Sequence, residues 1–316
     1  MKLEEVARLA GLVSRSSEPE SQLAVQQALE KLGYEPGSFY QELEMSHRFV
    51  DTHQDVSYSN TAVQLHSHTF YEVLCCRNTC GVEYLVGADR YRLQRGDIIL
   101  VPPGISHRPL LPEGMTEPYR RDVLWISQEF MSTMSRVFPQ GLEGSMSTRL
   151  IRTAGTRWEY LIQKFRQGVK EAERRDVGWE AALAANTLQI LVQLSRAALE
   201  QTMPLRAEKP ELLDLALAYV EENLGEKITL AEVAKHFYVS ESTVSQTFRK
   251  KMGVSFYRCV SQRRLIAAKT LIEEGVLLEE VSRRVGFMDY SAFYRAFRQE
   301  FGISPRQYRN KYQGNS

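Results

Sequence analysis

Two stretches in the last hundred residues decide the fold of this part of the chain. Residues Thr229–Gly253 read TLAEVAKHFYVSESTVSQTFRKKMG, and residues Leu277–Gly302 read LLEEVSRRVGFMDYSAFYRAFRQEFG. In each stretch, apolar residues at helical spacing lead into a short break, after which a capping residue (Ser240 or Asp289) opens a second helix. Each stretch therefore predicts a helix, a tight turn and a second helix, which together form a helix-turn-helix unit.

A long helical pattern over Phe256–Glu274 joins the two units. One helix-turn-helix pattern is short and would be weak evidence by itself. Two of them, held at a fixed spacing by a helix, indicate a domain that places one helix of each unit in the major groove of DNA.

The charge distribution agrees with this interpretation. From Ser242 to the C-terminus the chain has 14 basic and 6 acidic residues, although its overall net charge is only +1. Such a local excess is typical of a surface that binds phosphates. Scattered, solvated charges are the alternative, and the clustering within two helix-turn-helix units disfavours it.

Residues 210–312 resemble the DNA-binding domain of AraC/XylS-type transcription regulators. The resemblance implies a bacterial-type transcription regulator whose partners are double-stranded operator DNA and, as a candidate, RNA polymerase. It rests on these sequence runs: Ala231–Ala234, Ser240–Ser242, Phe248–Lys250, Gln262–Ala268, Val285–Phe287, Phe293–Arg298 and Gly302–Arg309.

The second helix of each unit supplies the candidate DNA-contacting residues. Exposed positions near its N-terminus face base edges, and later basic residues hold phosphates. Gln246 suits adenine and Arg295 suits guanine, whereas Lys250 and Arg298 suit phosphates. Some of the polar positions could instead only cap or solvate their helix. The full predicted set is Ser242, Thr243, Ser245, Gln246, Arg249, Lys250, Tyr290, Ser291, Arg295 and Arg298.

Residues 62–125 show short alternating runs separated by glycine and proline turns, which predicts an antiparallel barrel or sandwich. We interpret Val63–Leu74 as one strand, so that His66, His68 and Glu72 point to the same side. His107 follows a turn that returns the chain to the same mouth. We therefore expect these four side chains to converge inside the barrel.

The same residues resemble the two sequence segments of the cupin family, which is a jelly-roll barrel. In metal-binding cupins, the equivalents of His66, His68, Glu72 and His107 hold iron, manganese or zinc, and three imidazoles with one carboxylate suit such ions. A divalent transition metal is thus a candidate ligand of these four residues. The alternatives are that they line an effector pocket, which we favour, or that they belong only to the barrel framework.

The predicted effector is a small polar molecule such as a sugar. The expected effector-binding residues are His66, His68, Glu72, Tyr84 and His107. Neighbouring aromatic and polar side chains could complete the pocket or belong to the core: Phe70, Tyr71, Arg108 and Trp125.

The chain of 316 residues is predicted to be an α+β multidomain protein, in which a cupin-like barrel with helices precedes an all-α tandem helix-turn-helix domain. Helical patterns at 155–172 and 179–200 are, by family resemblance, a dimer interface, so a homodimer is expected. The predicted parts are a helical extension (1–60), the effector-binding and dimerisation domain (61–200), a linker (201–209) and the DNA-binding domain (210–316).

No run of eighteen apolar residues and no signal-peptide core is found in the sequence, which predicts a cytoplasmic protein without a membrane partner. A metal-dependent cupin enzyme fused to a DNA-binding module is the rival interpretation. It is disfavoured because no second set of acid and base residues accompanies the four candidate ligands, so no catalytic residues are assigned. A ligand-independent architectural DNA binder would not need the barrel.

Overall fold

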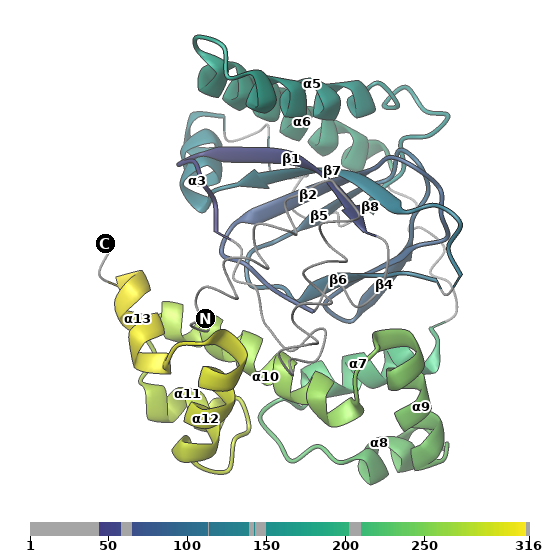
Figure 1. Cartoon of the computed structure of the whole chain (residues 1–316), viewed down its shortest axis with the longest axis vertical. Helices are drawn as coiled ribbons and strands as arrows, with labels where there is room; N and C mark the ends of the chain where they lie inside the picture. Colours follow the sequence, from purple (N-terminus) through teal and green to yellow (C-terminus); the bar gives the residue numbers. More distant parts are fainter. Residues whose placement is uncertain are drawn as a thin grey trace, which may run out of the picture.

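The computed structural model describes residues 44–57, 65–112, 114–138, 142, 150–201 and 210–313. Residues 1–43 of the expected helical extension and 202–209 of the expected linker lie outside this description. Within it, two helices, two facing sheets and the C-terminal helices follow one another as layers (Figure 1). This α+β architecture confirms the predicted fold class.

The N-terminal part contains a five-stranded sheet with the order β1-β7-β2-β5-β8 and a three-stranded sheet with the order β4-β3-β6. All paired strands run antiparallel. The strands are β1 (Val50–Ser57), β2 (Tyr71–Cys76), β3 (Glu83–Val86), β4 (Asp89–Arg92), β5 (Ile98–Val101), β6 (His107–Leu110), β7 (Tyr119–Ile126) and β8 (Leu150–Ile151).

Strand register decides which side chains enter the space between the two sheets. Glu72 pairs with Trp125 across β2 and β7, and Val86 pairs with His107 across β3 and β6. Because directly opposed residues of an antiparallel pair point to the same face, Glu72 and His107 both face the barrel interior. An apolar core that includes Phe70 and Trp125 fills most of this interior.

The sequence prediction was wrong for residues 50–57, which we had placed in the helical extension. They form β1, whose residues pair with β7 from Val50 to Ser57, and Thr52 Oγ1 donates to the Val123 carbonyl at 2.7 Å. As an edge strand, β1 is only partly buried. Its mixed polarity therefore carried no clear strand signal.

Helices cover the outer face of the larger sheet (Figure 1). The long helix α6 (Trp179–Glu200) has the predicted bounds, whereas α5 (Leu161–Arg174) begins six residues later than expected because 154–160 form turns and a bend. A shorter helix, α3 (Gln128–Val137), follows β7. Within the described ranges, no helix is both long enough and apolar enough to cross a bilayer.

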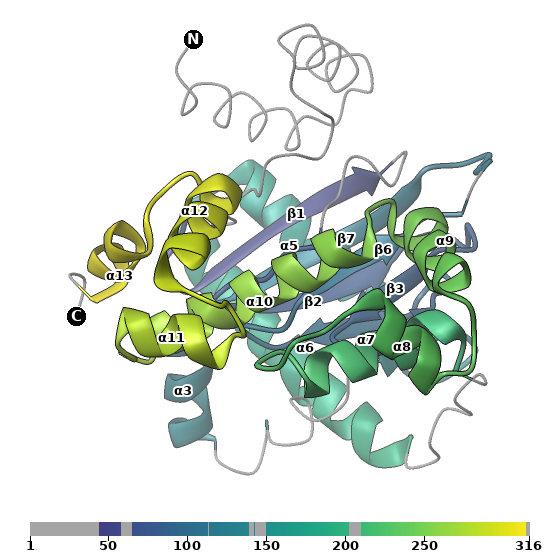
Figure 2. The same cartoon turned by 90° about the horizontal axis from the view of Figure 1, so that it is seen from below.

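The C-terminal part is all helical, and Figure 2 shows α10 running between the two helix-turn-helix units. Ser240 accepts a hydrogen bond from the Thr243 N–H at 3.1 Å and Asp289 accepts one from Ala292 at 2.7 Å, so both predicted caps are formed. The helices are α7 (Leu212–Glu222), α8 (Leu230–His236), α9 (Glu241–Met252), α10 (Phe256–Glu273), α11 (Leu278–Arg284), α12 (Tyr290–Phe301) and α13 (Pro305–Gln313).

The turn of the second unit depends on Gly286. Its φ is +79°, and a Cβ atom added there would lie 2.3 Å from the Leu224 carbonyl oxygen. Gly253 has a similar φ of +69° but open space around it. We expect Gly253→Ala to cost about 1–2 kcal/mol for the left-handed backbone alone.

Gly286→Ala should cost about 1–3 kcal/mol more, because the backbone must also move away from the added methyl group. The measurement is urea unfolding of the full chain followed by far-ultraviolet circular dichroism. Equal losses in the two variants would show that the close approach to Leu224 does not constrain the turn.

Candidate functional site

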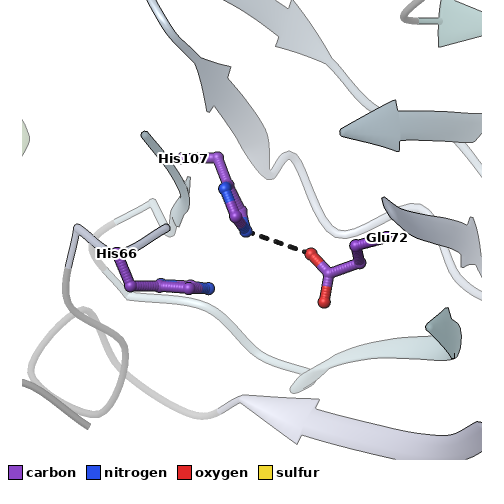
Figure 3. A group of neighbouring side chains, drawn as sticks. All are labelled: His66, Glu72 and His107. Atoms are coloured by element: carbon purple, nitrogen blue, oxygen red, sulfur yellow. Dashed lines mark ion pairs between the residues drawn. The ribbon is translucent and has the colours of Figure 1, made fainter. Parts of the chain in front are cut away.

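His66, Glu72 and His107 converge between the sheets (Figure 3). Glu72 comes from β2 and His107 begins β6, while His66 pairs with His107 through two backbone hydrogen bonds of 3.2 and 2.9 Å. Nε2 of His107 lies 3.1 Å from Oε2 of Glu72. Glu72 and His107 are buried, and His66 is half-buried.

The expectation that one strand carries His66, His68 and Glu72 was wrong. Only Glu72 belongs to β2, and residues 67–70 form no strand. His68 stacks on Phe70 with ring centroids 4.0 Å apart, and its Nδ1 donates to the Phe70 carbonyl at 2.7 Å. This local turn brings His68 to the cluster by a different route, with Nε2 3.8 Å from Oε2 of Glu72.

The tautomers of two imidazoles follow from their backbone contacts. Nδ1 of His68 faces the Phe70 carbonyl and Nδ1 of His107 faces the Ile105 carbonyl at 2.8 Å. A carbonyl oxygen can only accept, so both Nδ1 atoms must carry a hydrogen. In a neutral imidazole Nε2 is then an acceptor, like Oε2 of Glu72, which both Nε2 atoms face; in a protonated imidazole Nε2 donates to that oxygen.

Electrostatics keep this carboxylate ionised. Burial raises the pKa of Glu72, but the imidazoles of His107 and His68 outweigh this effect and hold the pKa well below its usual range. Burial lowers the pKa of His68, and the neighbouring Glu72 only partly opposes the shift. The cluster therefore presents a buried negative charge that a proton on an imidazole, or the donor groups of a ligand, must match.

Some residues next to the cluster in sequence or register face the space between the sheets, and others face outward. Trp125 Nε1 donates to Oε1 of Glu72 at 2.8 Å, and the ring of Tyr84 lies 6.3 Å from that of His107. Tyr71 and Arg108 do not complete this site, contrary to one expectation. Tyr71 packs on the α5–α6 side of the larger sheet, and Arg108 points out of the smaller one.

Sequence reasoning missed one buried cation in the barrel. Arg121 on β7 is 5% exposed, and its guanidinium bonds Ser57 at 2.9 Å and Asp55 at 2.5 Å. Its place two residues before Val123 and four before Trp125 puts it on the inner face of the strand. The two-residue alternation of side chains along β7 is the sequence signal that could have identified this buried arginine.

Three of the four candidate metal ligands fit a metal ion. One ligand atom from each of His66, Glu72 and His107 lies within 4.8 Å of the others, and His68 is not part of this group. Two imidazoles and a carboxylate suit a divalent transition metal. These three residues would hold such an ion, and His68, whose Nε2 lies 3.8 Å from Oε2 of Glu72, borders the group without belonging to it.

The first recognition helix, α9, exposes most of the predicted DNA-contacting residues. Gln246, Arg249 and Lys250 are exposed, and Ser245 is half-buried. The hydroxyl groups of Ser242 and Thr243 are exposed, but each lies 2.7 Å from the capping hydroxyl of Ser240. These two hydroxyls are thus already engaged in the helix cap.

The second recognition helix, α12, exposes Ser291, Arg295 and Arg298, while Tyr290 is half-buried. Phe293 and Phe297 are completely buried on its opposite face. The amphipathic pattern thus turns the predicted readers outward, as the sequence indicated.

The basic residues of this domain fall into two groups: those that are paired with acids or buried, and those that are exposed. Lys251 pairs with Glu211, and Arg258 pairs with Glu300. Arg263 and Lys269 are buried, so they do not contribute to a DNA-binding surface. Exposed basic side chains of α9 and α12 that pair with no acid within the described residues are Arg249, Lys250, Arg295 and Arg298.

Comparison with known proteins agrees with these features. The family described as "Helix-turn-helix domain" matches residues 233–311. The HTH-type transcriptional activator RhaS of Salmonella arizonae is 28% identical over 254 residues, covering 77% of this chain and 86% of that protein. RhaS of Escherichia coli O139:H28 is 25% identical over 255 residues, with the same coverage.

Among solved structures, the C-terminal domain of AraT, a response regulator from Geobacillus stearothermophilus, is 27% identical. It covers 32% of this chain and 86% of its own, with a TM-score of 0.32.

The tandem helix-turn-helix units, the family match and the similarity to RhaS indicate a DNA-binding transcription regulator. More closely, the match over residues 233–311 and the similarity to the RhaS activators support a regulator of the AraC/XylS type.

Proposed function

We propose that this chain is a one-component, sequence-specific regulator whose DNA binding responds to a small polar effector in the barrel. His66, His68, Glu72, Tyr84 and His107 would contact the effector. The two recognition helices would bind or release operator DNA. RNA polymerase would be the partner whose transcription this binding regulates. A sugar is the favoured class of effector, because its hydroxyl groups are donors of the kind the cluster lacks.

The single observation that carries the effector proposal is the set of acceptors around Glu72. Within the described residues, Nε2 of His68, Nε2 of His107 and Oε2 of Glu72 have no hydrogen-bond donor aligned on them. Buried polar atoms in native proteins are nearly always paired. A ligand with two or three hydroxyl groups would supply donors to atoms that the protein leaves facing one another.

A metal ion at His66, Glu72 and His107 is the second candidate, favoured by their ligand atoms lying within 4.8 Å of one another. It would act as a Lewis acid or as a structural ion. The relatives are named as transcriptional activators, so a regulatory role for such an ion is preferred to a metal-dependent enzyme.

The effector proposal predicts that a ligand raises the melting temperature of the full chain, because it binds only the folded form. The probes are a panel of pentoses and hexoses and, separately, Zn²⁺ and Mn²⁺. Glu72→Gln should abolish the shift, since it removes the central charge while keeping the shape of the side chain.

Glu129→Gln is the matched control on the exposed helix α3, and it should keep the shift. A shift with a sugar but not with a metal favours the effector, and the reverse favours the ion. Equal shifts in wild type and Glu72→Gln, or none with any probe, would contradict the proposal.

The two recognition helices generate a prediction about DNA. Arg295→Ala should cost about 1–3 kcal/mol at one base position and relax the preference there. Lys250→Ala should weaken binding to all DNA sequences alike and reduce the slope of log affinity against log salt concentration by about 1. Both are measured by titrating the full chain with a duplex selected by the wild-type chain from a random library, and with its single-base variants.

Arg283→Ala is the control for the DNA prediction, because this exposed arginine pairs with Glu280 on α11. Its loss should change neither affinity nor preference. A uniform loss across all duplexes for Arg295→Ala would assign that residue to phosphate instead of a base.

The proposed dimer interface lies on α6. Ala181, Ala185, Leu188 and Val192 recur at helical spacing; the two alanines are exposed, and Leu188 and Val192 are half-buried at the edge of the core. We expect the wild-type chain to sediment as a dimer at micromolar concentration, and Ala185→Glu to shift it to monomer by placing a charge in the apolar contact. Ala231→Glu, at an exposed position of α8, is the matched control. A monomeric wild-type chain would exclude this interface.

A further inference from the structure

The outer face of the smaller sheet is docked on the DNA-binding domain (Figure 1). Leu65, Leu85 and Leu110 from the barrel side share one apolar cluster with buried residues of α7, α9 and α10. Arg90 on β4 adds bonds of 2.9 and 3.0 Å to Asp214, at the start of α7. Barrel and DNA-binding domain are therefore in direct contact through side chains of both.

Arg108 makes the contact that reaches the first recognition helix. It is 3% exposed, and its Nη1 donates to the carbonyl of Met252 at 2.8 Å. Met252 is the last residue of α9, where carbonyls have no partner within the helix and the helix dipole is negative. A buried guanidinium thus satisfies the end of the helix that carries Gln246 and Arg249.

Arg108 is also the residue next to His107. On β6 the two side chains point to opposite faces, so His107 reaches Glu72 while Arg108 reaches α9. His107 is completely buried, and Arg108 is nearly so. Close-packed surroundings leave little room for one to move without the other.

We propose that Arg108 couples the His66–Glu72–His107 cluster to the first recognition helix, by converting a shift of β6 at His107 into a shift of the C-terminal end of α9. This inference rests on the proposed function, because the cluster is the place where the effector would bind.

The other interdomain arginines act differently. Arg263 on α10 donates to the Gly87 carbonyl at 2.9 Å, and Arg90 holds α7. Gly87 and Arg90 lie in the β3–β4 turn and on β4, neither of which carries a residue of the cluster. In this proposal these contacts hold the domains together, and β6, which carries both His107 and Arg108, transmits the change.

The test is a double-mutant cycle read by hydrogen–deuterium exchange of the full chain. Glu72→Gln perturbs the cluster whatever it binds, so no identified effector is required. In the wild-type background it should change amide exchange in the last turn of α9 by about 5-fold or more, the usual lower size of such couplings. In the Arg108→Met background the change should fall below about 2-fold.

Arg92→Met is the control, because Arg92 is an exposed arginine on the same sheet, and it should leave the effect of Glu72→Gln unchanged. Arg108→Lys is the second variant, for use if Arg108→Met unfolds; its single ammonium group has a shorter reach, so it too should weaken the coupling. An equal change in α9 exchange with and without Arg108, or no change on Glu72→Gln, would overturn the proposal. Failure of every sugar and metal probe would instead contradict the effector assignment and leave the cycle interpretable.

Discussion

The smaller sheet lies between two cores, and the alternation of side chains along its strands decides which core each residue serves. On β3, Tyr84 and Val86 face the barrel interior, while Leu85 faces the DNA-binding domain. On β6, His107 and Arg108 divide in the same way. Because the period of a strand is two, a slip of one residue would exchange both sets and dismantle both cores.

Buried arginines are the second constraint on this arrangement. Burial lowers the pKa of Arg108 to about 10 and that of Arg263 to about 9, which reflects how costly it is to keep these charges away from water. Carbonyl oxygens of Met252 and Gly87 offset part of that cost. Removing one of these carbonyl partners while the arginine stays buried would leave an uncompensated charge. Separation of the domains would instead expose both guanidinium groups to water.

The cluster in the barrel and the two recognition helices differ in how much local sequence reveals. The helix-turn-helix units were predicted to within a few residues, because caps such as Ser240 and Asp289 and the apolar spacing are local signals. For the cluster, the residues that would converge were predicted from motif spacing. The prediction that one strand carries His66, His68 and Glu72 was wrong, because a turn at His68 and Phe70 replaces that strand.

The sequence by itself determined the tandem helix-turn-helix domain, the antiparallel β-rich part before it and the histidines near Glu72. Only the tertiary structure decided that β1 completes the larger sheet, that Arg263 is buried instead of facing DNA, and that Arg108 leaves the barrel to reach Met252. The physical reason is the range of the interactions. Helix periodicity and capping act within a few residues, whereas strand pairing and the partner of a buried charge lie far away in the chain: Arg108 and Met252 are separated by 144 positions.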